Sequence, residues 1–165
     1  LACAVPTRLG FLVRASGATF LIDCGVSTLI GMRRLGLQPN DIDTVFVTHL
    51  HGDHFGGLAW LLIDAQYVSK RTRPLIVTGP RGIEERFVRA AEAHYPDITK
   101  CQRCFPFDFI EYEEQVPLTL NGISITTPER AASSAMRTRR ASSSASGGAP
   151  IEKTTPTWCV PCAGM

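Results

Sequence analysis

Apolar residues along this chain recur in two patterns, one with the short period of strands and one with the longer period of helices. The stretches that predict strands are 11–14, 18–23, 42–48, 74–78, 105–112, 116–120 and 123–126. Gly17 supplies a turn between the first two stretches, and Asn121-Gly122 joins the last two. Asn-Gly favours a type I′ turn, because that turn needs positive φ at both central positions. Two hairpins are therefore expected.

Three segments carry apolar residues at helical spacing, namely 27–35, 58–68 and 82–94. The first is followed by Gly36, a typical residue after a helix end. The second is apolar on most faces and predicts a buried helix, whereas the third has one apolar face and predicts a surface helix. Because strands and helices interleave along the sequence, we expect an α/β layered fold.

The composition changes after Thr127. Residues 128–150 are mostly Ser, Ala, Arg, Gly and Pro, and such a segment cannot bury enough apolar surface to offset its chain entropy. We therefore predict one domain over residues 1–127 and a low-complexity tail over 128–165, either disordered or out of the reading frame. A basic cluster in this tail could contact a phosphate backbone, but a solvated tail is the favoured interpretation.

Composition and charge narrow the function classes. The 165 residues are 44% hydrophobic, which is ordinary for a globular domain. The net charge of +2 is too small to give the protein an electrostatic field that favours nucleic acid. No apolar run approaches the ~18 residues of a membrane-spanning helix, so no membrane partner is expected. The first residues have neither a basic segment nor an apolar core of signal-peptide length, which favours a cytoplasmic location.

The strongest chemical signal is the run His49-Leu50-His51-Gly52-Asp53-His54. Imidazole nitrogen and carboxylate oxygen are ligands that suit Zn²⁺, and also Mn²⁺ or Fe²⁺. His49 and His51 are two residues apart, so in an extended segment they can face one cation, while Asp53 and His54 can turn toward a second. Four such side chains within six positions indicate a two-metal site that activates water.

The segment Thr48–Leu58 resembles the HxHxDH signature of the metallo-β-lactamase-fold hydrolases, and its Leu-His-Gly-Asp-His order is most similar to ribonuclease Z and its phosphodiesterase relatives. Two further segments resemble motifs of that family in the same order. They are Leu21–Gly25, a strand that ends in Asp-x-Gly, and Arg73–Ile83, a strand with a Gly-Pro-x-Gly turn. The resemblance covers about residues 9 to 127 and implies a metallo-β-lactamase-like αββα sandwich, of which this chain holds an incomplete part.

The resemblance also implies a metal-dependent hydrolase, a phosphodiesterase or a ribonuclease Z-like enzyme, with two Zn²⁺ ions per site. His49 and His51 would hold the first metal, and Asp53 and His54 the second. Asp53 would also act as the catalytic residue that accepts the proton of the attacking water. Asp23 would brace the loop by hydrogen bonding around the metal site, although a simple strand-end carboxylate is an equal alternative.

The chain departs from the family after its second hairpin. The family supplies a third histidine to the first metal, a bridging aspartate and a final histidine, but here no histidine follows His94 and no aspartate follows Asp108. Catalytic zinc usually has three protein ligands, so two ligands per metal should weaken binding. Glu129 is an alternative ligand, but nothing in the sequence indicates that its side chain points toward the metal site. The second hypothesis is therefore a catalytically inactive remnant, truncated or frame-shifted, that retains part of the metal site.

The substrate is less well defined by the sequence. Segment 66–73 contains Lys70, Arg71 and Arg73, which could contact a phosphate near the site mouth, although a solvated helix end is favoured. The segment is too short for the protruding arm with which ribonuclease Z enzymes grip tRNA. A small phosphodiester or another ester is therefore as acceptable as RNA. A homodimer is an open alternative, because relatives are often dimers.

Six cysteines include two Cys-x-x-Cys pairs, Cys101/Cys104 and Cys159/Cys162. Such pairs can form a structural Zn²⁺ site. The gap between them is much longer than in a compact zinc ribbon, so a shared site is the less favoured interpretation. Cys24 follows an apolar strand and is expected to be a small buried residue.

We predict that the coding sequence after residue 127 has shifted out of the family's frame or has diverged, because a family-like pattern gives way to low complexity there. Sequencing the encoding DNA and translating its other frames tests the frame shift. We expect one frame to restore a segment with a histidine and a Gly-Asp pair, and the absence of such a frame would contradict the frame shift.

Overall fold

The computed structural model describes residues 3–6, 10–15 and 17–127. Its elements, in chain order, are β1 (Cys3–Pro6), β2 (Phe11–Ala15), β3 (Ala18–Ile22), α1 (Thr28–Arg34), the 3₁₀-helix η1 (Pro39–Asp41), β4 (Thr44–Phe46), α2 (Gly52–Phe55), α3 (Leu58–Ile63), the π-helix η2 (Asp64–Val68), β5 (Leu75–Gly79), α4 (Ile83–His94), the 3₁₀-helix η3 (Ile98–Lys100), β6 (Phe107–Glu111), β7 (Leu118–Leu120) and β8 (Ile123–Ile125). The predicted tail, with Glu129 and the Cys159/Cys162 pair, lies outside the described residues.

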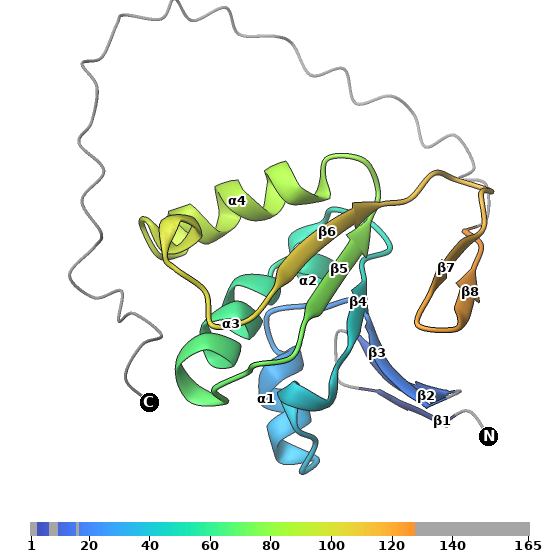
Figure 1. Cartoon of the computed structure of the whole chain (residues 1–165), viewed down its shortest axis with the longest axis horizontal. Coiled ribbons are helices and arrows are strands. Elements are labelled where there is room, and N and C mark those ends of the chain that lie inside the picture. The colour runs from blue at the N-terminus through green and yellow to red at the C-terminus, as the bar shows by residue number, and fades with distance from the viewer. Residues whose placement is uncertain (1–2, 7–9, 16, 128–165) are drawn as a thin grey trace, which may run out of the picture.

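Six strands form one sheet in the order β1-β2-β3-β4-β5-β6, and β7 and β8 form a separate hairpin (Figure 1). The pairs β1–β2 and β2–β3 are antiparallel, whereas β3, β4, β5 and β6 run parallel to one another. Helices connect these parallel strands, as parallel pairing requires. The predicted α/β class is therefore confirmed.

The two predicted hairpins are present. Gly17 has a φ of +80° between β2 and β3. Asn121 and Gly122 have φ values of +49° and +76° between β7 and β8, as a type I′ turn needs. The sequence analysis did not predict β1, which adds a further antiparallel strand at the edge of the sheet.

The predicted helix over 58–68 differs from the structure, because its second half is a π-helix. α3 ends at Ile63, and the wider turn of η2 is closed by a hydrogen bond of 2.7 Å from the Ser69 N–H to the Asp64 carbonyl. The longest helix of the described ranges, α4, has 12 residues, and no helix there is long and apolar enough to cross a lipid bilayer.

Alternate residues of the central strands face opposite sides of the sheet. Leu21, Val45 and Val77 lie in register on β3, β4 and β5 and have no exposed surface. They pack in one hydrophobic core with apolar residues of α3 and α4, and Figure 1 shows the helices gathered on this side of the sheet. The main core therefore lies between the sheet and its helices.

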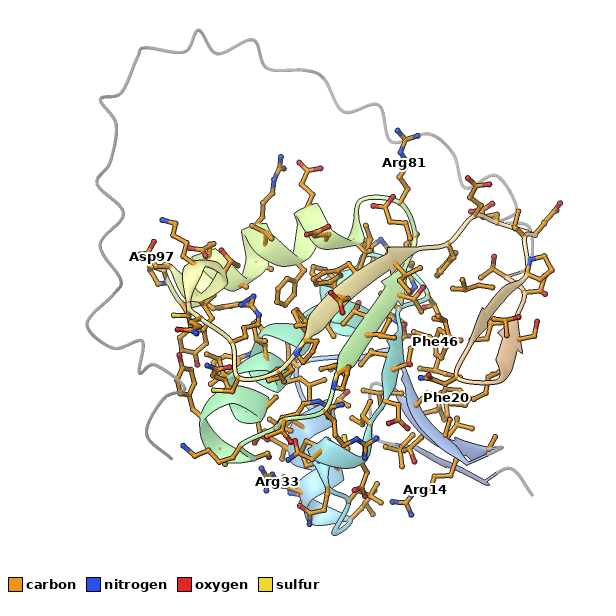
Figure 2. The ribbon with its side chains drawn as sticks, viewed as in Figure 1. Arg14, Phe20, Arg33, Phe46, Arg81 and Asp97 are labelled. Atoms are coloured by element: carbon orange, nitrogen blue, oxygen red, sulfur yellow. The ribbon has the colours of Figure 1, made fainter. Side chains whose placement is uncertain are left out.

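The second face of the sheet is also apolar and is covered by the β7–β8 hairpin. Phe20 and Phe46 pack edge to face here, with ring centroids 5.3 Å apart, and Figure 2 shows both on the side of the hairpin. The side-chain amide of Asn121 donates a hydrogen bond of 3.1 Å to the Thr44 hydroxyl oxygen. The hairpin turn is thus attached to the middle of the sheet.

Cys24 is buried at the turn after β3, as predicted. Burial, with the nearby Asp23 carboxylate, raises the pKa of its thiol to about 12, so the thiol stays neutral. Its backbone N–H donates to the His54 carbonyl at 2.6 Å, and its own carbonyl accepts the Gly57 N–H at 2.8 Å. A Cβ atom on Gly57 would lie 2.1 Å from the Gly25 carbonyl oxygen. Only glycine at position 57 therefore permits this close packing.

The structure corrects the interpretation of Arg71, which neither reaches a substrate nor lies in solvent. Its side chain is 2% exposed, and burial lowers the pKa of its guanidinium. The guanidinium donates to the carbonyl oxygens of Ile42 and Pro74 at 2.7 and 2.6 Å, and to those of Asn40 and Arg73. These carbonyls precede β4 and β5, so Arg71 ties together the amino ends of the two central strands.

Arg71→Met should lower the free energy of unfolding by about 3 kcal/mol or more, because several buried carbonyl oxygens lose their donor at once. Urea denaturation followed by circular dichroism measures this loss. The same replacement at the exposed Arg89, which pairs with Glu85 on α4, is the control and should cost less than about 1 kcal/mol. Equal costs at the two positions would contradict the structural role of Arg71.

Candidate metal centre

The histidine loop, residues 48–54, lies at the carboxyl end of β4. After a bend at Thr48 and His49 it reaches His51, which is extended with a φ of −85° and a ψ of 145°, and then turns into the single-turn helix α2. Asp23 occupies the corresponding position after β3. Because the carboxyl ends of parallel strands meet at one edge of a sheet, this edge collects the polar side chains of successive loops. His49 thus comes from a bend, His51 from an extended residue, and Asp53 and His54 from a helical turn.

The three imidazole rings of the loop lie together. The centroid of the His49 ring is 4.7 Å from that of His51 and 3.8 Å from that of His54. The pKa of His49 is lowered, mainly by burial and further by the neighbouring His54 and His51. Asp23 and Asp53 act in the opposite direction. The neutral form of His49, which is the form that binds metal, is therefore favoured.

Asp53 and His54 face each other across a short gap. Oδ2 of Asp53 and Nε2 of His54 are 3.4 Å apart. Two ligand atoms around a tetrahedral zinc ion are about 3.3–3.5 Å apart when each bond is about 2.0–2.1 Å long. When Nε2 of His54 carries its lone pair, both atoms are acceptors, and a cation between them relieves their repulsion. The pair therefore fits the second metal position that the sequence predicted.

A single carboxylate, that of Asp23, organises the loop from the side of β3. It accepts three hydrogen bonds: from the backbone N–H of Thr48 at 2.8 Å, from the Thr48 hydroxyl at 2.9 Å and from Nδ1 of His54 at 2.8 Å. Asp23 is only 8% exposed and has a φ of +60°, a conformation that aspartate tolerates better than most residues. Its backbone N–H is held by the Phe46 carbonyl at 2.7 Å. The hydrogen bonds by which Asp23 was expected to brace the loop are therefore present.

These contacts determine which ring nitrogens carry hydrogen. A carboxylate only accepts hydrogen bonds, so Nδ1 of His54 is the donor to Asp23, and in the neutral ring Nε2 then carries the lone pair. The Thr48 hydroxyl donates its hydrogen to Asp23, so its oxygen accepts from Nδ1 of His49, which lies 2.9 Å away. His49 is then also left with a free Nε2. Such an arrangement around Nδ1 is typical of metal-binding histidines.

The donor set therefore fits a divalent metal such as Zn²⁺, since three imidazoles and a carboxylate are grouped at one edge, and Nδ1 of His49 and of His54 is engaged in hydrogen bonds. Across residues 3–6, 10–15 and 17–127, however, no three His, Cys, Asp or Glu side chains converge as a metal-binding group. The two metals that the sequence predicts would each find two of the expected ligands in this part of the chain.

Comparison with known proteins places the chain in a family. A family model described as "Anti-Pycsar protein Apyc1" matches residues 8–129. The chain belongs to this family. Ribonuclease Z from Lachnoclostridium phytofermentans is 35% identical over 118 residues, which are 72% of this chain and 32% of the relative. Ribonuclease Z from Geobacillus kaustophilus is 37% identical over 105 residues, with 64% and 32% covered.

Two solved structures are also similar to this Apyc1-family chain. Human tRNase Z, short form (ELAC1), is 34% identical, with 62% of this chain and 38% of that chain covered and a TM-score of 0.48. The metallo-β-lactamase fold protein YhfI from Bacillus subtilis is 22% identical, with 71% and 43% covered and a TM-score of 0.49.

The predicted resemblance to ribonuclease Z is confirmed: the Apyc1-family chain is a ribonuclease Z-like protein in its sequence, and it has the predicted α/β class of fold. It spans about a third of the length of the curated relatives that it matches.

A cavity of about 830 Å³ opens beside the candidate metal centre of this Apyc1-family chain. His49 and His51 form part of its wall, next to Thr48 and Tyr112. The rest of the wall is mainly apolar and comes from the second face of the sheet and from the hairpin. These apolar residues are Phe20, Ile22, Phe46, Val47, Ile123 and Ile125. The volume lies within the range of about 300–1,000 Å³ that is usual for small-ligand sites.

Two residues that position the loop were missed by the sequence analysis. Thr48 was quoted only as part of the motif, and Tyr112, which follows β6, was assigned only to a strand. The Tyr112 hydroxyl donates to the carbonyl oxygens of Val47 at 2.9 Å and Thr48 at 3.0 Å. Tyr112 lies 64 positions after Thr48 in the chain, so no local pattern could indicate this contact.

The remaining candidates lie away from the centre. His94, at the end of α4, packs its ring 5.8 Å from that of Trp60. Cys101 and Cys104 are disulfide-bonded, so their sulfur atoms are not thiolates that could bind zinc. The less favoured interpretation of a Cys₄ zinc site is therefore not supported by this pair.

Asp23→Asn should change the hydrogen position on His54, because an amide nitrogen facing Nδ1 would act as a donor and move the ring hydrogen to Nε2. Nitrogen-15 chemical shifts of the His54 ring measure this directly, and affinity for Zn²⁺ should fall by about 10–100-fold. Asp41→Asn is the matched control, since Asp41 is half-exposed and pairs with Arg14. An unchanged His54 tautomer in Asp23→Asn would contradict the assignment.

Proposed function

We propose that this chain is a metal-dependent hydrolase that cleaves phosphodiester bonds, with Zn²⁺ as the favoured metal and Mn²⁺ or Fe²⁺ as alternatives. One observation carries the proposal. Asp53 and His54 hold two ligand atoms 3.4 Å apart, beside His49 and His51, at the carboxyl edge of a parallel sheet. The names of the ribonuclease Z relatives give independent support for hydrolysis of a phosphodiester.

Each side chain has a defined part in this proposal. His49 and His51 would hold a first metal, and Asp53 and His54 a second. When bound, the metals act as Lewis acids that lower the pKa of water and stabilise negative charge on the reacting group. The exposed carboxylate of Asp53 is free to accept the proton of the attacking water. Asp23 holds Nδ1 of His54 and so leaves Nε2 facing the Asp53 carboxylate.

The substrate that this proposal favours is a small phosphodiester or the end of an RNA strand. The relatives are named for action on RNA, but the cavity next to His49 and His51 has the size of a small-ligand site. Its apolar walls around Phe20 and Phe46 suit a planar or apolar group more than a phosphate backbone. A cytoplasmic location and a homodimer stay predictions.

A catalytically inactive form is the second candidate. It is favoured because no three ligands converge within the described residues, which leaves two for each metal, whereas catalytic zinc usually has three. Elemental analysis of protein purified without chelator separates the candidates. About two equivalents of metal per folded chain support the hydrolase, whereas one or fewer, lost on dialysis, support the inactive form.

Hydrolysis of bis-p-nitrophenyl phosphate with added Zn²⁺ or Mn²⁺ tests the proposed activity. His51→Ala should lower the rate by more than about 100-fold, since even residues behind the ligands account for about 10–100-fold. His94→Ala is the matched control, because His94 is exposed on α4 and contacts Trp60. It should keep the rate within about twofold. If His51→Ala and the unmodified chain hydrolyse the substrate equally, the hydrolase proposal is wrong.

A further inference from the structure

The phenol of Tyr112 reaches the histidine loop from the side opposite to Asp23. Tyr112 follows β6, which is separated from β4 by β5 in the sheet order. Its hydroxyl nevertheless donates to the carbonyl oxygens of Val47 and Thr48, at 2.9 and 3.0 Å. The side chain therefore spans from the edge of the parallel sheet to the segment that enters the loop.

The backbone around Tyr112 is itself fixed. The Tyr112 N–H donates to the Gly79 carbonyl at 2.9 Å, which continues the pairing of β5 with β6. The neighbouring Glu111 carboxylate accepts the N–H of Gly82 at 2.6 Å, at the start of α4. Because the Tyr112 backbone and its neighbour Glu111 are both hydrogen-bonded to residues at the end of β5 and the start of α4, the hydroxyl has a firm base from which to hold the histidine loop.

The N–H, the hydroxyl and the carbonyl of Thr48 consequently all form hydrogen bonds. Its N–H and hydroxyl bond to Asp23 on the β3 side, and its carbonyl accepts from Tyr112 on the β6 side. This carbonyl belongs to the peptide plane that links Thr48 to His49, so its orientation sets the direction in which the His49 backbone leaves the strand. Val47 is held in addition through its N–H, which donates to Thr78 at 2.7 Å.

We infer that Tyr112 is a positioning residue for the candidate metal centre, which acts on His49 and His54 through the backbone of Val47 and Thr48. The inference rests on the proposed function for its link to metal binding, but the positioning itself is a property of the metal-free chain. In this role Tyr112 acts through hydrogen bonds to the backbone and not as a metal ligand. It limits the motion of the peptide that carries the first histidine.

Tyr112→Phe tests the inference, because it removes one hydroxyl and keeps the ring. Amide hydrogen exchange by nuclear magnetic resonance should become about three- to tenfold faster at Thr48 and His54. Core amides at Val45 and Val77 should exchange at the original rate. Tyr95→Phe is the matched control, since Tyr95 packs on Trp60 far from the loop. It should leave Thr48 and His54 unchanged.

Titration with Co²⁺, followed by its visible absorption, gives the second readout. Affinity should fall about three- to tenfold in Tyr112→Phe and stay constant in Tyr95→Phe. If the unmodified chain binds no Co²⁺, the proposed function fails while the exchange rates still decide the role of Tyr112. Unchanged exchange at Thr48 would overturn the inference. Equal acceleration of loop and core amides would also overturn it, because that result indicates general stability and not positioning.

Discussion

The hydrogen bonding of the Asp23 carboxylate is the interaction on which the candidate centre depends. A carboxylate that is almost fully buried is costly unless donors surround it, and here all of its donors come from the histidine loop. The charge therefore stays satisfied only while Thr48 and His54 keep their positions. One residue that directly follows β3 thus imposes order on a loop that follows a different strand, and it does so before any metal is considered.

The same interaction links local chain geometry to chemistry. Asp23 adopts a left-handed backbone conformation, and Gly57 allows the turn after β3 to approach α2 closely. These two features bring the carboxylate to Nδ1 of His54 and, through the Thr48 hydroxyl, to Nδ1 of His49. Both rings then present Nε2 as the free nitrogen. The chain itself spans about a third of the length of its relative named ribonuclease Z.

Much of this arrangement was predictable from local patterns. The hairpin turns follow from Gly17 and Asn121-Gly122, because positive φ is a property of single residues, and the grouping of ligands follows from the spacing of His49 to His54. The contacts of Arg71 and Tyr112 were not predictable. Both depend on atoms brought together across the sheet, and the buried guanidinium resembles a surface charge when only its sequence neighbours are considered. The π-helix was likewise missed, since its periodicity over five residues cannot be separated from that of an α-helix.

The position of Arg71 has a consequence for how this protein can evolve. Arg71 joins β4 and β5 at their amino ends, whereas the histidine loop and Tyr112 lie at the carboxyl ends of the same sheet. Substitutions at the amino ends of the strands therefore change the stability of the fold, whereas substitutions at the carboxyl ends change the reactivity of the candidate centre. A lineage can lose or exchange ligands at the carboxyl edge while selection on folding, exerted at the opposite edge, continues to preserve the architecture.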